Sequence, residues 1–117
     1  MNKEKFGAPA SKPGSAGGVA LLEACAKGDL TACEYIYDVN ANAADVVTKA
    51  DRNGLTPMLY ACMGGHLSVC EWLYKVGADE DISRANNYGW TPLLWACMNG
   101  HLSVCEWLYK VGADEDI

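Results

Sequence analysis

The sequence predicts an all-α solenoid built from three stacked copies of one helix–turn–helix unit. The first observation is an internal duplication, because residues 65–82 are identical to residues 100–117. The second is a looser copy at the N-terminal side, where residues 22–35 align with residues 59–72. The third is that the six cysteines form three pairs with the same spacing, one pair in each copy. Repeats of about 20–50 residues are stacked units that cannot bury their apolar faces alone, and about three units are the minimum for a stable stack.

The first helix of each complete copy is predicted to begin at a Thr-Pro pair. Thr56 is a suitable N-cap, and Pro57 fits the first helical position, where a missing N–H costs nothing. Thr91 and Pro92 repeat the signal. An apolar run follows and meets Gly64-Gly65, which predicts a helix of about two turns.

A second helix is predicted directly after this turn. Apolar residues recur at helical spacing from Leu67 to Tyr74, and Ser68 with Glu71 has the spacing of a capping box. Gly77 is expected to close the helix in a left-handed conformation, before an acidic and polar connection to the next copy. The same box spacing recurs as Thr31 with Glu34 and as Ser103 with Glu106.

These residues resemble the ankyrin repeat. The resemblance rests on the stretch Asp51–Pro57, on Ala61-Cys62 and Gly65-His66, on Val69 and Leu73, and on Gly77-Ala78-Asp79, and it recurs over residues 86–114. It covers residues 21–117, with a degenerate first copy that starts directly at its helix. Leu59 and Leu94 stand where the family's Thr-Pro-Leu-His box has His, so the hydrogen bonds of that His are expected to be absent. Cysteine replaces the second residue of the family's Ala-Ala pair at positions 25, 62 and 97.

The resemblance implies a domain organisation and a shape. We expect a flexible leader over residues 1–20, because its Gly-rich segment reads as linker, and an ankyrin-repeat domain over residues 21–117. The repeats would span about 21–50, 51–85 and 86–117. Each would be an antiparallel helix pair whose connection projects as a β-turn finger.

Stacked copies should bring equivalent aromatic side chains together. We expect Tyr35, Trp72 and Trp107 to form one ladder, and Tyr60 with Trp95 to form another. Aromatic pairs in edge-to-face or offset contact contribute roughly 0.5–1.5 kcal/mol beyond their area burial. The ladders would then offset the absent box histidines.

Charge and composition exclude several functions. Nine Lys and Arg against fifteen Asp and Glu give a net charge of −6, which disfavours nucleic acid as a partner. No uninterrupted apolar run is longer than Leu93–Met98, which is far below the roughly 18–20 residues that cross a bilayer, so no membrane partner is expected. The first twenty residues lack the apolar block of a secretory signal. We therefore expect a chain of the cytoplasm, or alternatively of the nucleus.

The sequence disfavours several kinds of chemical site. Cys62, His66 and Cys70 are residue types that bind zinc, yet their spacing does not match compact sites, and the resemblance explains the Gly-His pair structurally. The resemblance places the cysteines where the family has Ala and Val, so they are expected to be buried small apolar side chains and not redox sensors. A Cys-His nucleophile is disfavoured because no orienting group or oxyanion loop is recognised. The acidic run 79–81 lacks the ligand order of an EF-hand, and Gly14–Gly18 lacks the spacing of a phosphate loop. No cofactor and no metal are expected, and the chain is not expected to be an enzyme.

Differences between the two complete copies indicate a recognition surface. They cluster on the fingers and on the first helix, which in the ankyrin family form the concave binding surface, whereas the second helix is unchanged. We therefore expect a noncatalytic module that binds an unidentified protein, with Tyr88 and an exposed Trp90 as anchors. The alternative is a recent duplication whose substitutions fall wherever packing permits. The expected partner-binding residues are Asn53, Leu55, Tyr60, Met63, Tyr88, Trp90, Trp95, Met98 and Asn99.

The third copy suggests a second function. Trp107 and Leu108 belong to a copy built to be covered, but Ile117 follows the third helix pair without a polar terminal repeat. Uncovered solenoid ends expose apolar surface. The sequence would then be a piece of a longer array, or the open repeat would pair with another chain, which makes self-association the alternative function.

Overall fold

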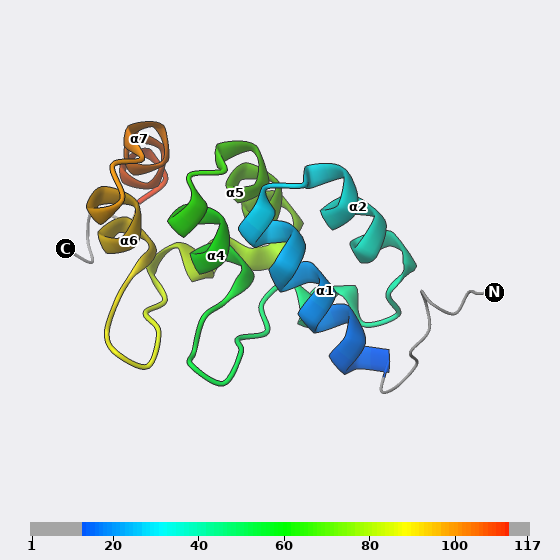
Figure 1. Cartoon of the computed structure of the whole chain (residues 1–117). Coiled ribbons are helices and arrows are strands. Elements are labelled where there is room, and N and C mark those ends of the chain that lie inside the picture. The colour runs from blue at the N-terminus through cyan, green and yellow to red at the C-terminus, as the bar shows by residue number, and fades with distance from the viewer. Residues whose placement is uncertain (1–12, 113–117) are drawn as a thin grey trace.

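The computed structural model describes residues 13–112, with side chains from residue 17 onward. Its helices pair in sequence order into three helical hairpins, which Figure 1 shows side by side along the molecule. The principal extents of 48 × 25 × 22 Å are those of an elongated stack. The described residues contain no strand, and the predicted all-α solenoid is confirmed. The helices are α1 (Pro13–Lys27), α2 (Leu30–Val39), α3 (Ala43–Val46), α4 (Pro57–Gly64), α5 (Leu67–Leu73), α6 (Pro92–Met98) and α7 (Leu102–Lys110).

Helix α1 corrects the expected flexible leader. It begins at Pro13, so residues 13–20 are helical and continuous with the first repeat, while residues 1–12 lie outside the described residues. The reason is tertiary, since α1 packs against α4 and α2 and fully buries Leu21 and Cys25. That burial outweighs the low helix propensity of Gly17 and Gly18.

The predicted starts of the first helices are confirmed. Thr56 Oγ1 accepts a hydrogen bond from the Leu59 amide at 3.1 Å, and Thr91 Oγ1 accepts one from the Leu94 amide at 3.3 Å. Gly65 ends α4 with φ 76°, in the left-handed region that favours glycine. These features depend on local contacts between side chain and backbone.

The predicted capping boxes are wrong. The N-caps of α2, α5 and α7 are Asp29, His66 and His101, so Ser68 lies inside its helix. Only Asp29 caps with its side chain, by accepting a hydrogen bond from the Ala32 amide at 3.1 Å. The two histidine side chains reach instead to the preceding repeat.

The connection after the second hairpin is partly helical. Helix α5 runs into the π-helical turn η2 (Tyr74–Ala78), where Gly77 has φ 126°, and then into the 3-10 turn η3 (Asp79–Ser83). The positive φ of Gly77 agrees with its expected role as the closing residue. Arg84 then donates a hydrogen bond to the Thr48 carbonyl at 2.9 Å, which ties this connection to the preceding one.

One continuous hydrophobic core runs through all three repeats, from Leu21 to Leu108. The cysteine pairs of the first two repeats lie in it fully buried, as expected. The third pair differs, because Cys97 is exposed and Cys105 is half-buried. No neighbouring repeat covers that pair within the described residues.

The expected aromatic ladders are wrong in their pairing. Trp72 meets Tyr37 and not Tyr35, with ring centroids 5.7 Å apart at 84°. Trp107 meets Tyr74 in the same edge-to-face manner at 5.7 Å. The indole of one repeat therefore packs on a phenol two residues beyond the equivalent position of the preceding repeat, and Tyr35 is left 67% exposed.

Candidate functional site

Two fingers project from the same side of the stack, between the helical hairpins (Figure 1). Each is organised by a polar side chain at its base. Asp51 Oδ1 accepts hydrogen bonds from the amides of Asn53 at 2.9 Å and Leu55 at 3.0 Å. Asn86 Oδ1 accepts hydrogen bonds from the Tyr88 amide at 2.8 Å and the Trp90 amide at 3.0 Å. Such turns fix the finger backbone without help from a partner.

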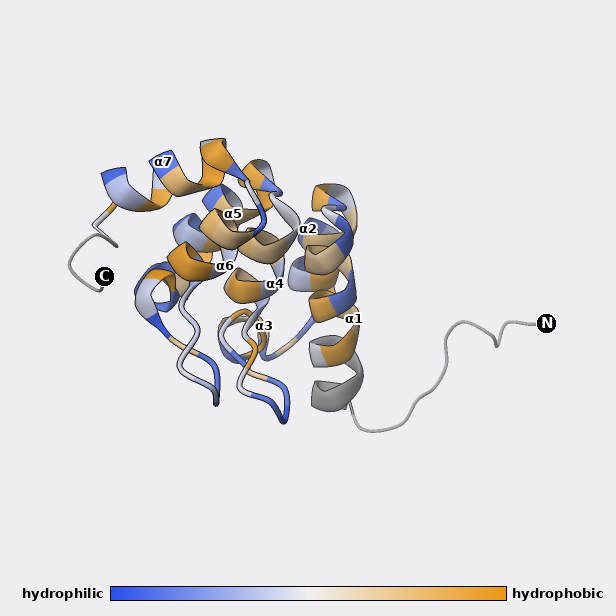
Figure 2. Ribbon diagram, turned by 60° about the vertical axis from the view of Figure 1, so that its left-hand side comes forward, coloured by the Kyte–Doolittle hydropathy of each residue, from blue (hydrophilic) through white to orange (hydrophobic). Residues whose placement is uncertain are grey.

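The two fingers also bond to each other. The Asn87 amide donates to the Asn53 carbonyl at 3.0 Å, and Asn87 Nδ2 donates to the Arg52 carbonyl at 2.9 Å. A Cβ at Gly54 would lie 2.4 Å from Asn87 Oδ1, so the approach requires glycine. Figure 2 shows hydrophilic residues at the finger tips. Tyr88 stands among them, 74% exposed.

Tyr60, another of the predicted residues, lies beside the first finger. Its hydroxyl donates to Asp51 Oδ2 at 2.6 Å. Burial, reinforced by this hydrogen bond and the carboxylate charge, raises the pKa of Tyr60 to about 12. Burial alone would raise the pKa of Asp51. Hydrogen bonds from Tyr60 and from the finger amides outweigh it and hold the pKa of Asp51 below its usual value. The finger is thus joined to α4 by a charged hydrogen bond.

A cavity of about 300 Å³ opens between α1, α4 and this finger. Tyr60 was among the residues predicted from the sequence, whereas the lining residues of α1 were not, and Val19 lies in the segment expected to be a flexible leader. The signal was present, since the α1 lining residues recur at helical spacing. The lining residues are Val19, Leu22, Glu23, Ala26, Asp51 and Tyr60.

The second finger carries a tryptophan pair. Trp90 and Trp95 have ring centroids 5.0 Å apart at 37°, and both are half-buried. Trp90 is therefore not the fully exposed side chain that was expected, because it packs on Trp95. Among the described residues Trp95 Nε1 is buried without a hydrogen-bond partner. The packed indoles of Trp90 and Trp95 thus belong to the same finger as the exposed Tyr88.

Of the remaining predicted residues, Met63 and Asn99 join the second repeat to the third, and Met98 lies away from the fingers on the surface of the third repeat. Asn99 Nδ2 and His101 Nε2 both donate to the Met63 carbonyl, at 3.0 and 2.9 Å. Met63 is half-buried, whereas Met98 is 63% exposed. The structure therefore groups Asn53, Leu55 and Tyr60 at one finger, and Tyr88, Trp90 and Trp95 at the next.

Histidines link each repeat to the one before. His66 Nε2 donates to the Ala26 carbonyl at 3.0 Å, as His101 does to Met63, because a carbonyl oxygen can only accept. A Cβ at Gly28 would lie 2.4 Å from His66 Nδ1, so glycine is needed beside the ring. The expected structural role of the Gly-His pair is confirmed, and the bond spans two repeats.

The outer side of the third repeat shows apolar residues that are covered in the second. Leu59 is fully buried, but its equivalent Leu94 is 48% exposed. Tyr74 receives Trp107, whereas its equivalent Tyr109 is 62% exposed. We name the exposed set the outer face. It consists of Leu94, Cys97, Met98, Leu102 and Tyr109.

Within residues 13–112 no group of three or more His, Cys, Asp or Glu side chains is arranged to hold a metal ion. No helix in the described range has the length and apolar character to cross a membrane. Fold and surface define a helical-repeat protein.

The family follows from this architecture and from sequence comparison. The family model described as ankyrin repeats, three copies, matches residues 21–117, and the chain belongs to the ankyrin-repeat family. Proteins of this family generally mediate protein–protein binding and are typically noncatalytic. A search of curated proteins found no match.

Proposed function

We propose that this chain is a noncatalytic protein-interaction module that binds a partner protein through its finger tips and the concave face of its first helices. The observation that carries the proposal is Tyr88, an aromatic side chain 74% exposed at the tip of a rigid finger. Tyrosine in such a position anchors many interfaces, and a backbone fixed in advance lowers the entropy lost on binding.

The neighbouring surface supports this assignment. The Trp90–Trp95 pair lies beside Tyr88, and the cavity between α1 and α4 lies at the other finger. Asn53, Leu55 and Tyr60 would contact the partner there. Met63 and Asn99 would contribute less because they bond to each other between repeats, and Met98 because it lies on the outer face. Three of the finger and first-helix positions that differ between the repeats are exposed in both, namely Arg52/Asn87, Asn53/Tyr88 and Gly64/Asn99.

A matched pair of variants tests the proposal. Tyr88→Ala removes the exposed tyrosine of the finger, and Tyr35→Ala removes an exposed tyrosine of α2. In pull-downs quantified by mass spectrometry, partners that use the fingers should be lost from Tyr88→Ala and retained by Tyr35→Ala. Equal capture by both variants and the unaltered chain would exclude the finger surface.

The proposed compartment is the cytoplasm, with the nucleus as the alternative. All six cysteines are free, including the close Cys97–Cys105 pair, which suits a reducing environment. Microscopy of the tagged full chain tests this, and accumulation in a secretory compartment would refute it.

Self-association is the second candidate function, and the outer face favours it. Exposed apolar surface of this kind marks interaction sites. If copies pair through this face, sedimentation should depend on concentration, and Leu102→Gln should abolish that dependence. Val39→Gln is the matched control, since Val39 is 62% exposed on α2. A monomer at every concentration would remove this candidate.

A further inference from the structure

The three cysteine pairs have the same sequence spacing but different surroundings. The sulfur atoms are 3.8 Å apart in Cys25–Cys33 and 3.6 Å apart in Cys62–Cys70. In Cys97–Cys105 they are 3.1 Å apart. The first two pairs are fully buried, whereas Cys97 is exposed and Cys105 half-buried. Contact between sulfurs and access for a reagent therefore coincide in the third pair.

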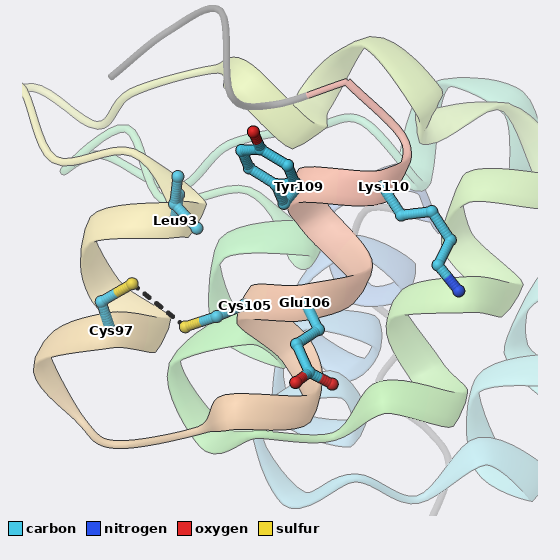
Figure 3. Close-up of a pocket in the computed structure, with 6 residues that line it drawn as sticks. All are labelled: Leu93, Cys97, Cys105, Glu106, Tyr109 and Lys110. Atoms are coloured by element: carbon cyan, nitrogen blue, oxygen red, sulfur yellow. Dashed lines mark hydrogen bonds between the residues drawn. The ribbon is translucent and has the colours of Figure 1, made fainter.

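The third pair also borders a groove of about 760 Å³. Figure 3 shows the two sulfurs facing each other, one from α6 and one from α7, with Glu106 and Lys110 nearby on α7. The groove has room for a small oxidant or for a peptide-sized thiol reagent. A disulfide would require the sulfurs to close to about 2.05 Å, a movement of about 1 Å.

We propose that Cys97 and Cys105 form a peroxide-sensitive dithiol, a modification site at which the two thiols are oxidised to a reversible disulfide that joins α6 to α7. The exposed Cys97 attacks the peroxide, and the recessed Cys105 resolves the product. This inference is independent of the proposed finger interface, since no residue is shared.

The chemistry balances in two steps. The Cys97 thiolate attacks one oxygen of hydrogen peroxide, the O–O bond breaks, and the products are a sulfenic acid and hydroxide, which takes up the proton released by Cys97 to form water. Cys105 then gives up its proton and its thiolate attacks the Cys97 sulfur; an S–S bond forms, the S–O bond breaks, and the hydroxyl leaves with that proton as water. Two thiols and one peroxide thus give one disulfide and two molecules of water.

The surroundings support this division of roles. Burial, with the hydrogen bond to Cys97, raises the pKa of Cys105 to about 11, so Cys105 keeps its proton until the second step. In the second repeat, the hydrogen bond to Cys70, together with burial, raises the pKa of Cys62 well above its ordinary value. Since the thiolate is the reactive form, Cys62 is chemically protected, and both thiols of this buried pair are inaccessible.

The experiment treats the full chain with hydrogen peroxide at a concentration where sedimentation shows a monomer. Trypsin then separates the pairs, because residues 85–110 contain Cys97 and Cys105 and residues 53–75 contain Cys62 and Cys70. Peptide 85–110 should lose the mass of two hydrogen atoms, at least about tenfold faster than peptide 53–75. Added dithiothreitol should restore the original mass.

Two variants test the roles, and a third is the control. Cys105→Ser should stop at the Cys97 sulfenic acid, trapped by dimedone, and Cys97→Ser should slow peroxide consumption at this site. Cys70→Ala should leave oxidation of the third pair at the unaltered rate, with circular dichroism confirming that each variant is folded. Equal oxidation of both peptides, or undiminished oxidation of Cys105 in Cys97→Ser, would overturn the proposal.

Discussion

Gly65 and Gly100 have the same backbone conformation but different neighbours. Their φ values are 76° and 75°, and each follows the first helix of its repeat. A Cβ at Gly65 would lie 2.5 Å from His101 Nδ1, whereas a Cβ at Gly100 would meet nothing within 4 Å. The two positions therefore separate backbone strain from contact between repeats.

We predict that Gly65→Ala destabilises the chain more than Gly100→Ala. Both variants place a side chain in the left-handed region, at about 1–2 kcal/mol. Gly65→Ala also displaces the His101 ring and weakens its bond to the Met63 carbonyl, which adds about 1 kcal/mol. Urea denaturation measures both free energies of unfolding. Equal losses would show that the imidazole contact adds nothing.

The second prediction concerns the indole between the first two repeats. Trp72→Ala should lower the free energy of unfolding by at least about 2 kcal/mol, because it removes half-buried area and the edge contact with Tyr37. A double-mutant cycle with Tyr37→Ala should give a coupling of about 0.5–1.5 kcal/mol.

Tyr35→Ala is the control for that cycle, and it should change stability by no more than about 0.5 kcal/mol because Tyr35 is exposed. A loss below about 1 kcal/mol for Trp72→Ala would show that aromatic contacts do not support the stack.

At the scale of elements, the first finger and α4 act as one unit through Tyr60 and Asp51. The raised pKa of Tyr60, about 12 against an ordinary 10.0, means that the folded state holds the phenolic proton more tightly. This contribution to stability is complete below pH 10 and is lost as the pH rises towards about 12. The lowered pKa of Asp51 acts at the other end, where stability is lost as the pH falls through the folded-state value.

Tyr60→Phe should therefore flatten the alkaline side of the stability profile. It should also lower stability at neutral pH by about 1 kcal/mol, since it removes a hydrogen bond to a charged group at a half-exposed site. Thermal unfolding between pH 7 and pH 12 provides the measurement. Tyr35→Phe keeps the Tyr60–Asp51 bond and should retain the original profile; a profile unchanged by Tyr60→Phe would contradict the assignment.

Features that depend on contacts between residues close in sequence could be predicted, and features that depend on packing between distant segments could not. The Thr56 and Thr91 caps were predictable because they join a side chain to an amide three residues away. The start of α1 was not, because its Gly-rich composition resembles a linker and its helix depends on packing against α4. The extra turns after α5 were missed for a similar reason, since the acidic run 79–81 reads as a solvated loop.

The same reasoning applies to the candidate site. The fingers were predicted from the family pattern, and the structure positions Tyr88 at a tip as expected. The pairing of Trp90 with Trp95 and the offset of Trp72 onto Tyr37 depend on how helices approach in space. The open side of the third repeat was expected from the sequence, but the cysteines were expected to be buried in every copy, so the exposure of Cys97 was not predicted.

At the scale of the whole molecule, each repeat is stabilised by its neighbours through one recurring set of contacts. An imidazole meets a carbonyl of the preceding repeat, and an indole meets its phenol. The second repeat has such contacts on both sides. The third has them on one side among the described residues, so α6 and α7 should be less stable than α4 and α5.

Hydrogen exchange can measure this gradient with an internal control. Residues 67–73 of α5 and residues 102–108 of α7 have identical sequences and flanking residues, so their intrinsic exchange rates are the same. Any difference in protection then comes from structure alone. We predict that α5 amides exchange more slowly than their α7 equivalents by on the order of tenfold, which corresponds to about 1.4 kcal/mol of local opening free energy. The measurement requires NMR, which resolves the amides of the two segments, because peptides of identical sequence have the same mass. Equal protection would mean that the outer face does not weaken the third repeat, and a concentration-dependent rise in α7 protection would identify self-association as the source of its stability.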